Sequence, residues 1–411
     1  MKQNLLLTKL LATAFFSFGI SSAMAQENQQ KTEKEAPIQI SFITPVGTNG
    51  TSSKITYNNI SINMLFGING GLKAAEFGGL INGINGNVHG AQFAGLGNYV
   101  CRDVSGAQFA GLANINKGTL NGCQFGGLAN LSHGNAYGAQ FAGLINTSSS
   151  FKGFQSSGLI NIVNGDLDGT QTSGIINYAK GGVRTGQISG LINISGGTQG
   201  KLQLAGLVNI ASGNTKGAQI SGLVNYSHTL NGVQIGLINI TDSIENGVTI
   251  GLINYAKNGY LSIGAFTDET FRAGISLRTG LKKLYSIVQI GYTNNPYWGI
   301  GFGLGSYLVN GNKISLTLEG LSFQINEDEW WTDKTNMLVR MNLNFEYHLS
   351  SRMSIVAGIS DNMAISRLRN AEGLLSGGSF IPGMTFFDHT GKRTKTVMYP
   401  GISFGFQYQI R

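Results

Sequence analysis

Three consecutive stretches of this chain repeat one another: VHGAQFAGLGNYVCRD (88–103), VSGAQFAGLANINKGT (104–119) and LNGCQFGGLANLSHGN (120–135). Each carries an apolar residue, Gly, Gln, Phe, Gly, Leu and Asn at the same places. A fixed period of this length is typical of arrays in which each unit packs on the next. One unit is too short to bury a core alone, so many copies are expected.

Further copies extend in both directions from this stretch. The motif G-[LI]-x-N occurs twelve times at steps of 14 to 16 residues, beginning at Gly79, Gly95, Gly111, Gly127, Gly143, Gly158, Gly174, Gly190, Gly206, Gly222, Gly236 and Gly251. In most copies a Gln stands three residues before this Gly, and a second apolar position stands about seven before it. Each unit therefore holds two short apolar strands and two glycine corners.

The length of the unit separates the possible arrangements. A membrane-spanning hairpin needs two strands of about 9 to 11 residues, more than one period contains. A soluble meander with one hairpin per repeat remains an alternative. Coils of a parallel β-solenoid, about 4.8 Å apart, explain the invariant columns better because like residues then stack.

Stacking predicts two ladders of side-chain amides along the solenoid, one of Asn and one of Gln. The Asn ladder includes Asn98, Asn114, Asn130, Asn146, Asn161, Asn177, Asn193, Asn209 and Asn225. We expect a dry interior formed by the Leu of each motif together with Phe93, Phe109, Phe125, Phe141, Ile188, Leu204 and Ile220.

Composition agrees with an all-β protein. The 411 residues are 41% hydrophobic and 12% charged, with 61 Gly, 5 Pro and 2 Cys, which argues against both disorder and a disulfide-stapled miniprotein. The net charge of +8 is spread thinly, without a basic cluster interleaved with aromatic residues. Nucleic-acid binding is therefore disfavoured.

The N-terminus predicts export. Residues 1–25 have Lys2 and Lys9, an apolar stretch and an Ala-Met-Ala cleavage site, as a secretory signal peptide does. Residues 26–37 are polar and indicate a flexible tether. We expect N-terminal β-strands over 38–66, the repeat solenoid over 67–263 and an antiparallel β-barrel region over 264–411.

Outside the repeat, the hydrophobic period changes to two. Residues 337–349 alternate apolar and polar over thirteen positions, and the last strand, 396–410, does the same. Long strands with one apolar and one charged face fit an outer-membrane barrel, and a soluble sandwich with the apolar face inward is the alternative. Eight strands are expected, near 55–66, 270–279, 284–292, 297–308, 313–324, 337–349, 352–362 and 396–410.

That strand count predicts where the solenoid lies. It would fill the first connection of the barrel, on the outer side, where long loops occur. Residues 38–46 form a further predicted strand, which either pairs inside the barrel mouth or caps the solenoid. Arg272, Arg340, Glu319 and Glu346 are expected to fill the lumen.

Several segments resemble bacterial surface-repeat proteins of unknown function. The resemblance rests on ISFITPVGTNG (40–50), NNISINMLFGING (58–70), the GAQFAGLxN repeats and the EWW sequence at 329–331. The C-terminal strand also looks like the assembly signal of outer-membrane β-barrels, although Arg411 stands where an aromatic residue usually ends the chain. The resemblance implies an exported, outer-membrane or cell-surface protein and brings no catalytic residues.

Candidate sites are few. Cys101 and Cys123 are out of register with the repeat, so we expect unpaired packing residues, with a surface disulfide as the alternative. The five His occupy unrelated phases, and Asp166 and Asp168 lie one coil from Lys180 and Arg184, as solvated charge pairs do. No catalytic, cofactor or metal site is predicted. Trp330 and Trp331, amid acidic residues, are a candidate contact for a glycan or protein. The alternative is an interfacial girdle position or a loop packed over the barrel mouth.

The sequence thus predicts a non-enzymatic cell-surface repeat protein that displays a solenoid in a structural or adhesive role. Its expected partners are outer-membrane lipid and either a glycan or a protein of a host or neighbouring cell. Outer-membrane transport is the first alternative, which eight strands disfavour because they enclose only side chains. A secreted glycan-binding or glycan-processing solenoid is the second.

Overall fold

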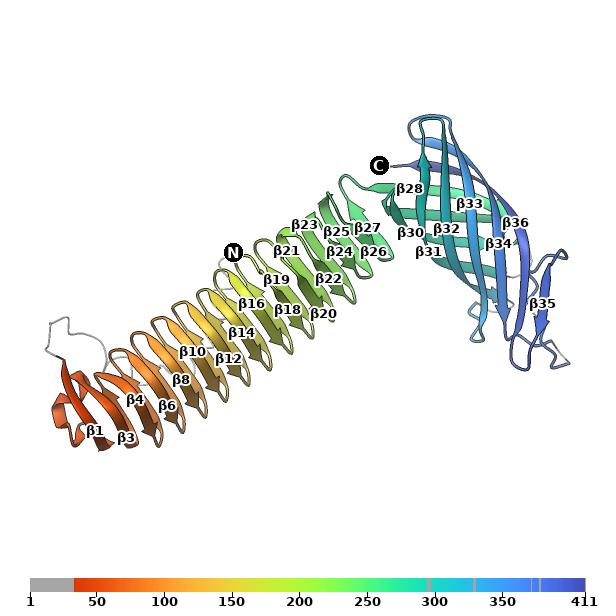
Figure 1. Cartoon of the computed structure of the whole chain (residues 1–411). Coiled ribbons are helices and arrows are strands. Elements are labelled where there is room, and N and C mark those ends of the chain that lie inside the picture. Colours follow the sequence, from red (N-terminus) through yellow and green to blue (C-terminus); the bar gives the residue numbers. More distant parts are fainter. Residues whose placement is uncertain (1–32, 294–296, 328–329, 371, 377, 411) are drawn as a thin grey trace. The chain divides into compact units, whose positions relative to one another are not determined.

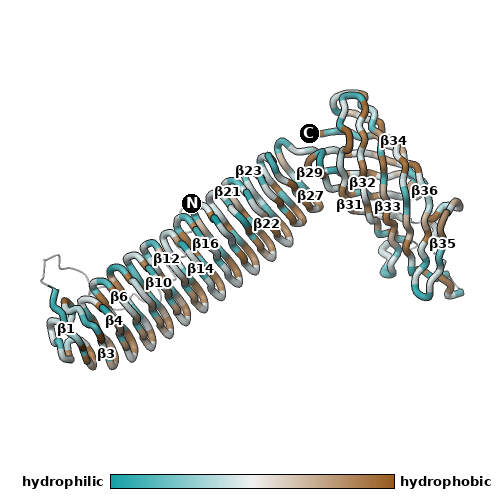
Figure 2. Tube along the Cα trace, viewed as in Figure 1, coloured by the Kyte–Doolittle hydropathy of each residue, from teal (hydrophilic) through white to brown (hydrophobic). Residues whose placement is uncertain are grey.

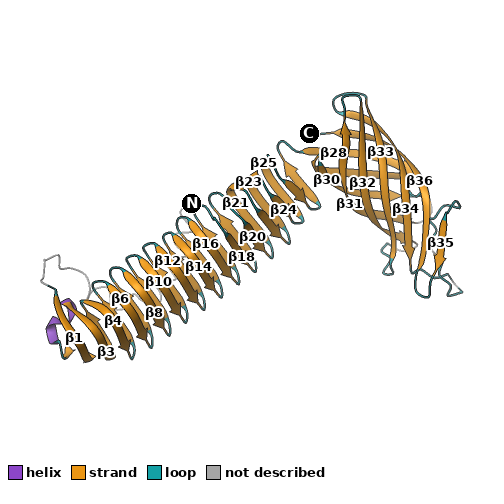
Figure 3. Cartoon of the chain, in the orientation of Figure 1, coloured by secondary structure: helices purple, strands orange, loops and turns teal. Residues whose placement is uncertain are grey.

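The computed structural model describes residues 33–293, 297–327, 330–370, 372–376 and 378–410. The predicted signal peptide and most of the predicted tether lie outside these residues. The chain divides into two compact units, Met1–Asn164 and Gly165–Arg411. It is all-β, a parallel β-solenoid of about twelve turns followed by an eight-stranded antiparallel barrel (Figures 1 and 3).

The first unit begins with a cap on the solenoid. It consists of β1 (Lys34–Ile43), β2 (Val46–Gly47), the 3-10 helix η1 (Gly50–Ile55) and β3 (Thr56–Asn69). Strand β1 pairs in parallel with β3, with Ile38 opposite Ile60. The predicted strand at 38–46 therefore caps the solenoid, and its first residues, Lys34–Pro37, belong to the segment expected as a tether. Lys34, Glu35 and Pro37 are typical of an edge strand that discourages further pairing.

Each following coil contributes two strands. The strands that carry the Gln are β4 (Gly71–Gly78), β6 (Val88–Ala94), β8 (Val104–Ala110), β10 (Leu120–Gly126), β12 (Ala136–Ala142) and β14 (Phe151–Ser157). The strands that carry the Asn are β5 (Ile81–Ile84), β7 (Gly97–Val100), β9 (Ala113–Asn116), β11 (Ala129–Ser132), β13 (Ile145–Ser148) and β15 (Ile160–Val163). Each pairs in parallel with its equivalent one coil away, so that Gln92 lies beside Gln108 and Asn98 beside Asn114.

The second unit continues the same repeat. Its Gln-side strands are β16 (Leu167–Ser173), β18 (Gly186–Ser189), β20 (Leu202–Ala205), β22 (Ala218–Ser221), β24 (Val233–Ile235) and β26 (Val248–Ile250). Its Asn-side strands are β17 (Ile176–Ala179), β19 (Ile192–Ser195), β21 (Val208–Thr215), β23 (Val224–Leu230), β25 (Ile238–Ile244) and β27 (Ile253–Ala256).

The interior of the solenoid corrects one prediction. The Asn and Gln columns are buried, together with an apolar column that includes Val88, Val104 and Leu120, whereas Phe93 and the Leu of each motif are exposed. Neighbouring residues of a strand point to opposite faces. With Gln92 inside, Phe93 must point outward. The expected Phe and Leu interior is therefore wrong, and these side chains form an outer surface.

The barrel consists of eight strands closed by pairing of the first with the last. They are β28 (Tyr260–Asp268), β29 (Ala273–Leu281), β30 (Leu284–Tyr292), β31 (Tyr297–Asn310), β32 (Ile314–Glu327), β33 (Asn336–His348), β34 (Met353–Ser366) and β36 (Lys395–Gln409). A short strand, β35 (Phe387–Thr390), pairs with β36 alone.

The number of barrel strands matches the expectation, but their membership differs. The predicted strand at 55–66 belongs to the solenoid, because β3 pairs in parallel with β1, β4 and β5. The first barrel strand is instead β28. Its residues were expected at the end of the solenoid, up to 263, or in the connection before the predicted strand at 270–279. The solenoid therefore precedes the barrel and does not fill a connection within it.

The barrel closes the C-terminal end of the solenoid. Nδ2 of Asn254 donates to Oγ of Ser286 at 2.8 Å, and the backbone N–H of Asn254 donates to Oγ1 of Thr279 at 3.0 Å. Leu281 packs on Leu230, Ile244 and Ala256, the last apolar residues of the solenoid core. Strands β29 and β30 thus cap the terminal coil, as the ends of a solenoid require.

Candidate functional site

The exterior of the barrel is apolar and its interior polar. On β33, Val339, Met341 and Phe345 point outward and are exposed, while Arg340 and Glu346 point inward and are buried. The same alternation exposes Ile402, Phe404 and Phe406 on β36. This distribution is the reverse of that in a water-soluble barrel.

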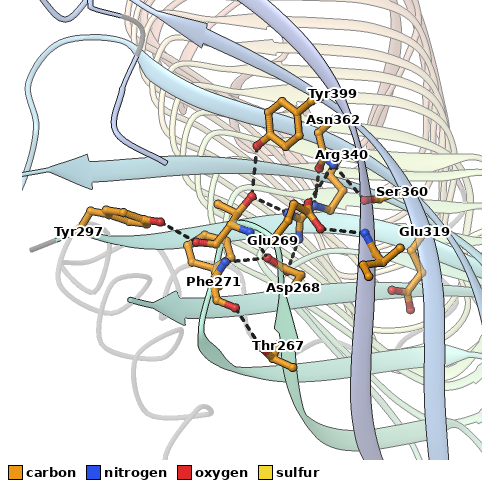
Figure 4. Close-up of polar contacts among 12 residues, drawn as sticks. Thr267, Asp268, Glu269, Phe271, Tyr297, Glu319, Arg340, Ser360, Asn362 and Tyr399 are labelled. Atoms are coloured by element: carbon orange, nitrogen blue, oxygen red, sulfur yellow. Dashed lines mark hydrogen bonds and ion pairs between the residues drawn. The ribbon is translucent and has the colours of Figure 1, made fainter. Parts of the chain in front are cut away.

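One polar cluster fills the lumen near the loop after β28 (Figure 4). Arg340 forms ion pairs with Asp268 and, at 2.9 Å between Nη2 and Oε1, with Glu269. Nε of Arg340 donates to Oδ1 of Asn362 at 2.7 Å. Oε2 of Glu269 accepts the backbone N–H of Ile402 at 3.0 Å. A buried guanidinium with two carboxylate partners holds this loop against the barrel wall.

A second cluster fills the lumen towards the other end. Arg278 makes a bidentate ion pair with Glu319, at 2.7 Å from Nε to Oε1 and 3.1 Å from Nη2 to Oε2. The hydroxyl of Tyr285 donates to Oε1 of Glu319 at 3.0 Å, and that of Tyr307 donates to Oε2 of Glu346 at 2.8 Å.

A cavity of about 30 Å³ lies between Arg278, Glu319 and Arg340, room for a water molecule or two. Arg340, Glu319 and Glu346 fill the lumen as expected. Arg272 was also expected there, but it lies in the loop after β28 and is exposed, and Arg278 on β29 takes that role.

The two tryptophans of the predicted contact site lie at the end of the barrel with the longer loops. Trp330 is 83% exposed and Trp331 is 52% exposed. Trp298 packs against both, with ring centroids 5.3 and 6.3 Å away, and its Nε1 donates to the carbonyl oxygen of Trp330 at 3.1 Å. Three indole rings therefore form one exposed aromatic cluster.

The predicted Asn ladder runs inside the solenoid. Within each unit, Nδ2 of one Asn donates to Oδ1 of the Asn in the next coil at 2.8 to 3.0 Å. The same nitrogen donates to a backbone carbonyl, for example from Asn98 to Phe109 at 2.9 Å. Because a carbonyl can only accept, this second bond fixes the direction of the amide. The ladder ends at Asn254, whose amide donates to Ser286 of the barrel.

The Gln ladder runs in the opposite direction. Nε2 of each Gln donates to Oε1 of the Gln in the preceding coil, as Gln108 does to Gln92 at 2.8 Å and Gln124 to Gln108 at 2.7 Å. The amide dipoles of the two ladders therefore oppose one another along the coil axis.

Glu76 ends the Gln ladder at its N-terminal side. It occupies the Gln column, opposite Gln92, and is fully buried. Its Oε2 accepts from Gln92 at 2.7 Å, and its Oε1 accepts from Asn63 at 2.9 Å and Asn69 at 2.6 Å. Three donors converge there, so an acceptor-only carboxylate suits the position better than an amide. Burial raises the pKa of Glu76 to about 7, although the hydrogen bonds from Gln92, Asn63 and Asn69 lower it.

Glu76 was not predicted as part of any site. It nevertheless stands three residues before Gly79, where most other repeats have Gln. Its place in that column was the signal that could have identified it as the end of the ladder.

The structure also places the cysteines and the charged residues of the repeats that the sequence singled out. Cys101 and Cys123 are free and partly buried. Arg184 and Asp168 make an exposed ion pair at 3.3 Å. Within the described ranges, no three His, Cys, Asp or Glu side chains come together as a metal site would need. None of the helices in that part of the chain is long and apolar enough to cross a membrane.

Comparisons with known proteins add one likeness. No protein-family model matches this chain, and no curated protein matches it. Among solved structures, the crystal structure of neisserial surface protein A (NspA) aligns over 36% of this chain and 94% of that chain, with 11% identity and a TM-score of 0.22. A TM-score this low carries no argument. The resemblance to surface-repeat proteins stays a prediction.

Proposed function

We propose that this chain is a non-enzymatic outer-membrane protein whose barrel spans the membrane and carries the solenoid as a scaffold. One observation carries the proposal: the barrel exposes Val339, Met341 and Phe345 while it buries Arg340 and Glu346. In water this arrangement would expose a large apolar belt, whereas a bilayer covers it. Strands of nine to fifteen residues are long enough to cross the hydrocarbon core.

The loops favour a periplasmic solenoid. At the end of the barrel where β28 begins, the strands are joined by short turns, 282–283, 311–313 and 349–352. At the other end lie the longer connections, including 328–335 and 367–394. Outer-membrane barrels have short periplasmic turns and longer outer loops. The solenoid joins β28 at the short-turn end, so we place it in the periplasm and not, as the sequence suggested, outside the cell.

A structural role suits both parts. Ion pairs occupy the lumen, and a barrel of eight strands encloses little more than side chains, which favours an anchor over a channel. The solenoid is a regular scaffold in which the same Asn-to-Asn hydrogen bond recurs from coil to coil within each unit. A barrel that also caps the solenoid through Asn254 and Ser286 can hold it at the membrane.

Fractionation and gel migration test the anchor. The full chain should occur in the outer-membrane fraction, resist extraction by alkaline carbonate and migrate faster in the gel when it is not boiled, as folded barrels do. Recovery in the soluble periplasmic fraction, or identical migration with and without boiling, would contradict the proposal.

The aromatic cluster favours a second candidate function, adhesion through the outer loops. Trp330 and Trp331 are exposed next to Trp298, at the end that we place outside the cell. Exposed Trp is the side chain most enriched among binding hot spots. We propose a glycan or a surface protein of a host or neighbouring cell as the partner. Binding of whole cells to a glycan array, compared between wild type and a W330A/W331A variant, tests it.

A further inference from the structure

Five phenyl rings form an exposed column on the first unit. Phe77, Phe93, Phe109, Phe125 and Phe141 belong to five consecutive coils, with ring centroids 4.9 to 5.3 Å apart and ring planes within 9° of parallel. Each ring points away from the Gln ladder, and most are about 40% exposed.

A second apolar column follows the first around the corner of each coil. Its members are equally exposed leucines: Leu80, Leu96, Leu112, Leu128, Leu144 and Leu159. A groove of about 1160 Å³ follows the Phe column and is lined by its phenyl rings and by small residues such as Ala94 and Gly95. No residue that lines it is charged. In Figure 2 this corner of the coils is brown, and the opposite corner is mainly teal.

Coil stacking explains the glycines but not the phenyl rings. A Cβ at Gly95 would lie 2.1 Å from the carbonyl oxygen of Gly79, so stacking itself demands glycine there. The equivalent of the Phe column in the second unit contains Thr172, Ile188, Leu204, Ile220, Ile235 and Ile250. The solenoid therefore stacks without phenyl rings, and their surface is available for another purpose.

The area of this surface is that of a protein interface. At about 200 Å² for a full side chain of this size, of which some 40% is exposed, the two columns present on the order of 900 Å² of apolar surface. That exceeds the roughly 300–600 Å² of the largest patch on a typical monomer. It is close to the ~800 Å² that each partner buries in a stable interface.

We propose that the occupant is a second copy of this chain, which packs its own Phe and Leu columns against this face. The groove along the Phe column reaches Gly95 and its equivalents, and the Leu column follows one residue later, so a ridge stands beside a furrow. A two-fold axis brings the Leu ridge of each copy into the furrow of the other, as a self-complementary interface requires. Two copies share one spacing between coils, so their side chains stay in step along the interface. The uncharged lining brings no like charges together.

Cross-linking of the full chain in its membrane tests this pairing. In a C101S/C123A background, the substitution L112C puts one thiol at the centre of the Leu column. Cys123 lies in register with Ala107 and Ala139, so alanine suits that position. We expect a bis-maleimide to yield a species of twice the chain mass. Adding F109E and F125E should weaken the pairing by about tenfold or more.

A matched control separates the interface from folding. Tyr137 is 43% exposed on β12 but does not line the groove, so Y137E makes a comparable change outside the interface and should leave the dimer intact. Hydrogen exchange of β9 and β11 must be the same in all variants. A single-chain species in the wild type, or a dimer that F109E/F125E leaves unchanged, would overturn the proposal. Native mass spectrometry could instead show a single chain with a bound acyl lipid that F109E/F125E no longer binds. That result would also overturn the proposal. The test does not depend on which side of the membrane the solenoid occupies.

Discussion

Replacing Asn114 by Asp removes one amide donor from the Asn ladder without changing the size of the side chain. The amide Nδ2 donates to Oδ1 of Asn130 and to the carbonyl oxygen of Phe125, both at 2.9 Å. In N114D an oxygen takes the place of this nitrogen and faces two acceptors. The bond from Asn98 to Oδ1 remains.

The cost follows from the two acceptors that lose their donor. Each buried polar group left without a partner costs about 1–3 kcal/mol, so N114D should lower the free energy of unfolding by about 2–6 kcal/mol at pH 8. A protonated Asp can donate to one acceptor, so the folded state raises the pKa of the introduced carboxyl above its unfolded value. Stability is therefore highest below about pH 4 and falls as the pH rises through that higher pKa.

Hydrogen exchange of the full chain in lipid, read on β9 and β11 at pH 5 and pH 8, measures the change. The control is N121D, which makes the same substitution at an exposed Asn on β10 and should stay within about 0.5 kcal/mol of wild type. If β9 and β11 were equally protected from exchange in N114D and in N121D at both pH values, the Asn ladder would not stabilise the solenoid as we argue.

Three further predictions follow from Glu76, from the barrel wall and from the tryptophans. Burial raises the pKa of Glu76 from its usual 4.5 to about 7, so the folded state holds the proton more tightly than the unfolded state does. The free energy of exchange protection of β4 and β6 should therefore fall by up to about 3 kcal/mol between pH 4.5 and pH 7 and stay level above that. E76Q should abolish this pH dependence. M341R, at the middle of β33, should destabilise the barrel in bilayers by about 2–4 kcal/mol in a urea titration, whereas L349R at the strand end should cost at most about 1; equal costs would argue against a membrane belt. W330A/W331A should leave barrel unfolding unchanged because Trp330 is 83% exposed, and reduced barrel stability instead of reduced cell binding would make the pair a structural element.

The parallel stacking of the coils could be predicted because the repeat leaves few other arrangements. A sixteen-residue unit cannot cross a membrane, and its fixed columns need equivalent residues one coil apart. The structure has that register, with Asn98 beside Asn114 and Gln108 beside Gln124. Period-two alternation likewise identified seven of the eight barrel strands, because their two faces differ so strongly in polarity.

Which side chains point into the solenoid was harder to predict than the register of its strands. Gln108 and Phe109 are consecutive in one strand, so only one of them can point inward. Hydrophobicity favoured the Phe, but hydrogen bonds along the column satisfy the buried Gln fully enough for it to occupy the interior. The two ladders were predicted from the stacked repeats, but stacking alone does not say which face of the strand points inward.

The first barrel strand was misplaced for a different reason. Residues 55–66 alternate as a barrel strand does, and alternation cannot distinguish a parallel partner from an antiparallel one. Strand β28, at Tyr260–Asp268, is short, contains Gly264 and follows the last repeat directly. The predicted side of the membrane for the solenoid depended on this one strand, and the observed position of β28 leads to the opposite proposal, a periplasmic solenoid.

Labelling with a maleimide that does not cross membranes tests the placement of the solenoid most directly. In the C101S/C123A background, N135C puts a thiol on an exposed corner of the solenoid, and R393C puts one on the exposed turn between β35 and β36 at the long-loop end. We expect intact cells to label R393C alone, and N135C to react only after the outer membrane is permeabilised. Rapid labelling of N135C on intact cells, with R393C protected, would place the solenoid outside and contradict the account.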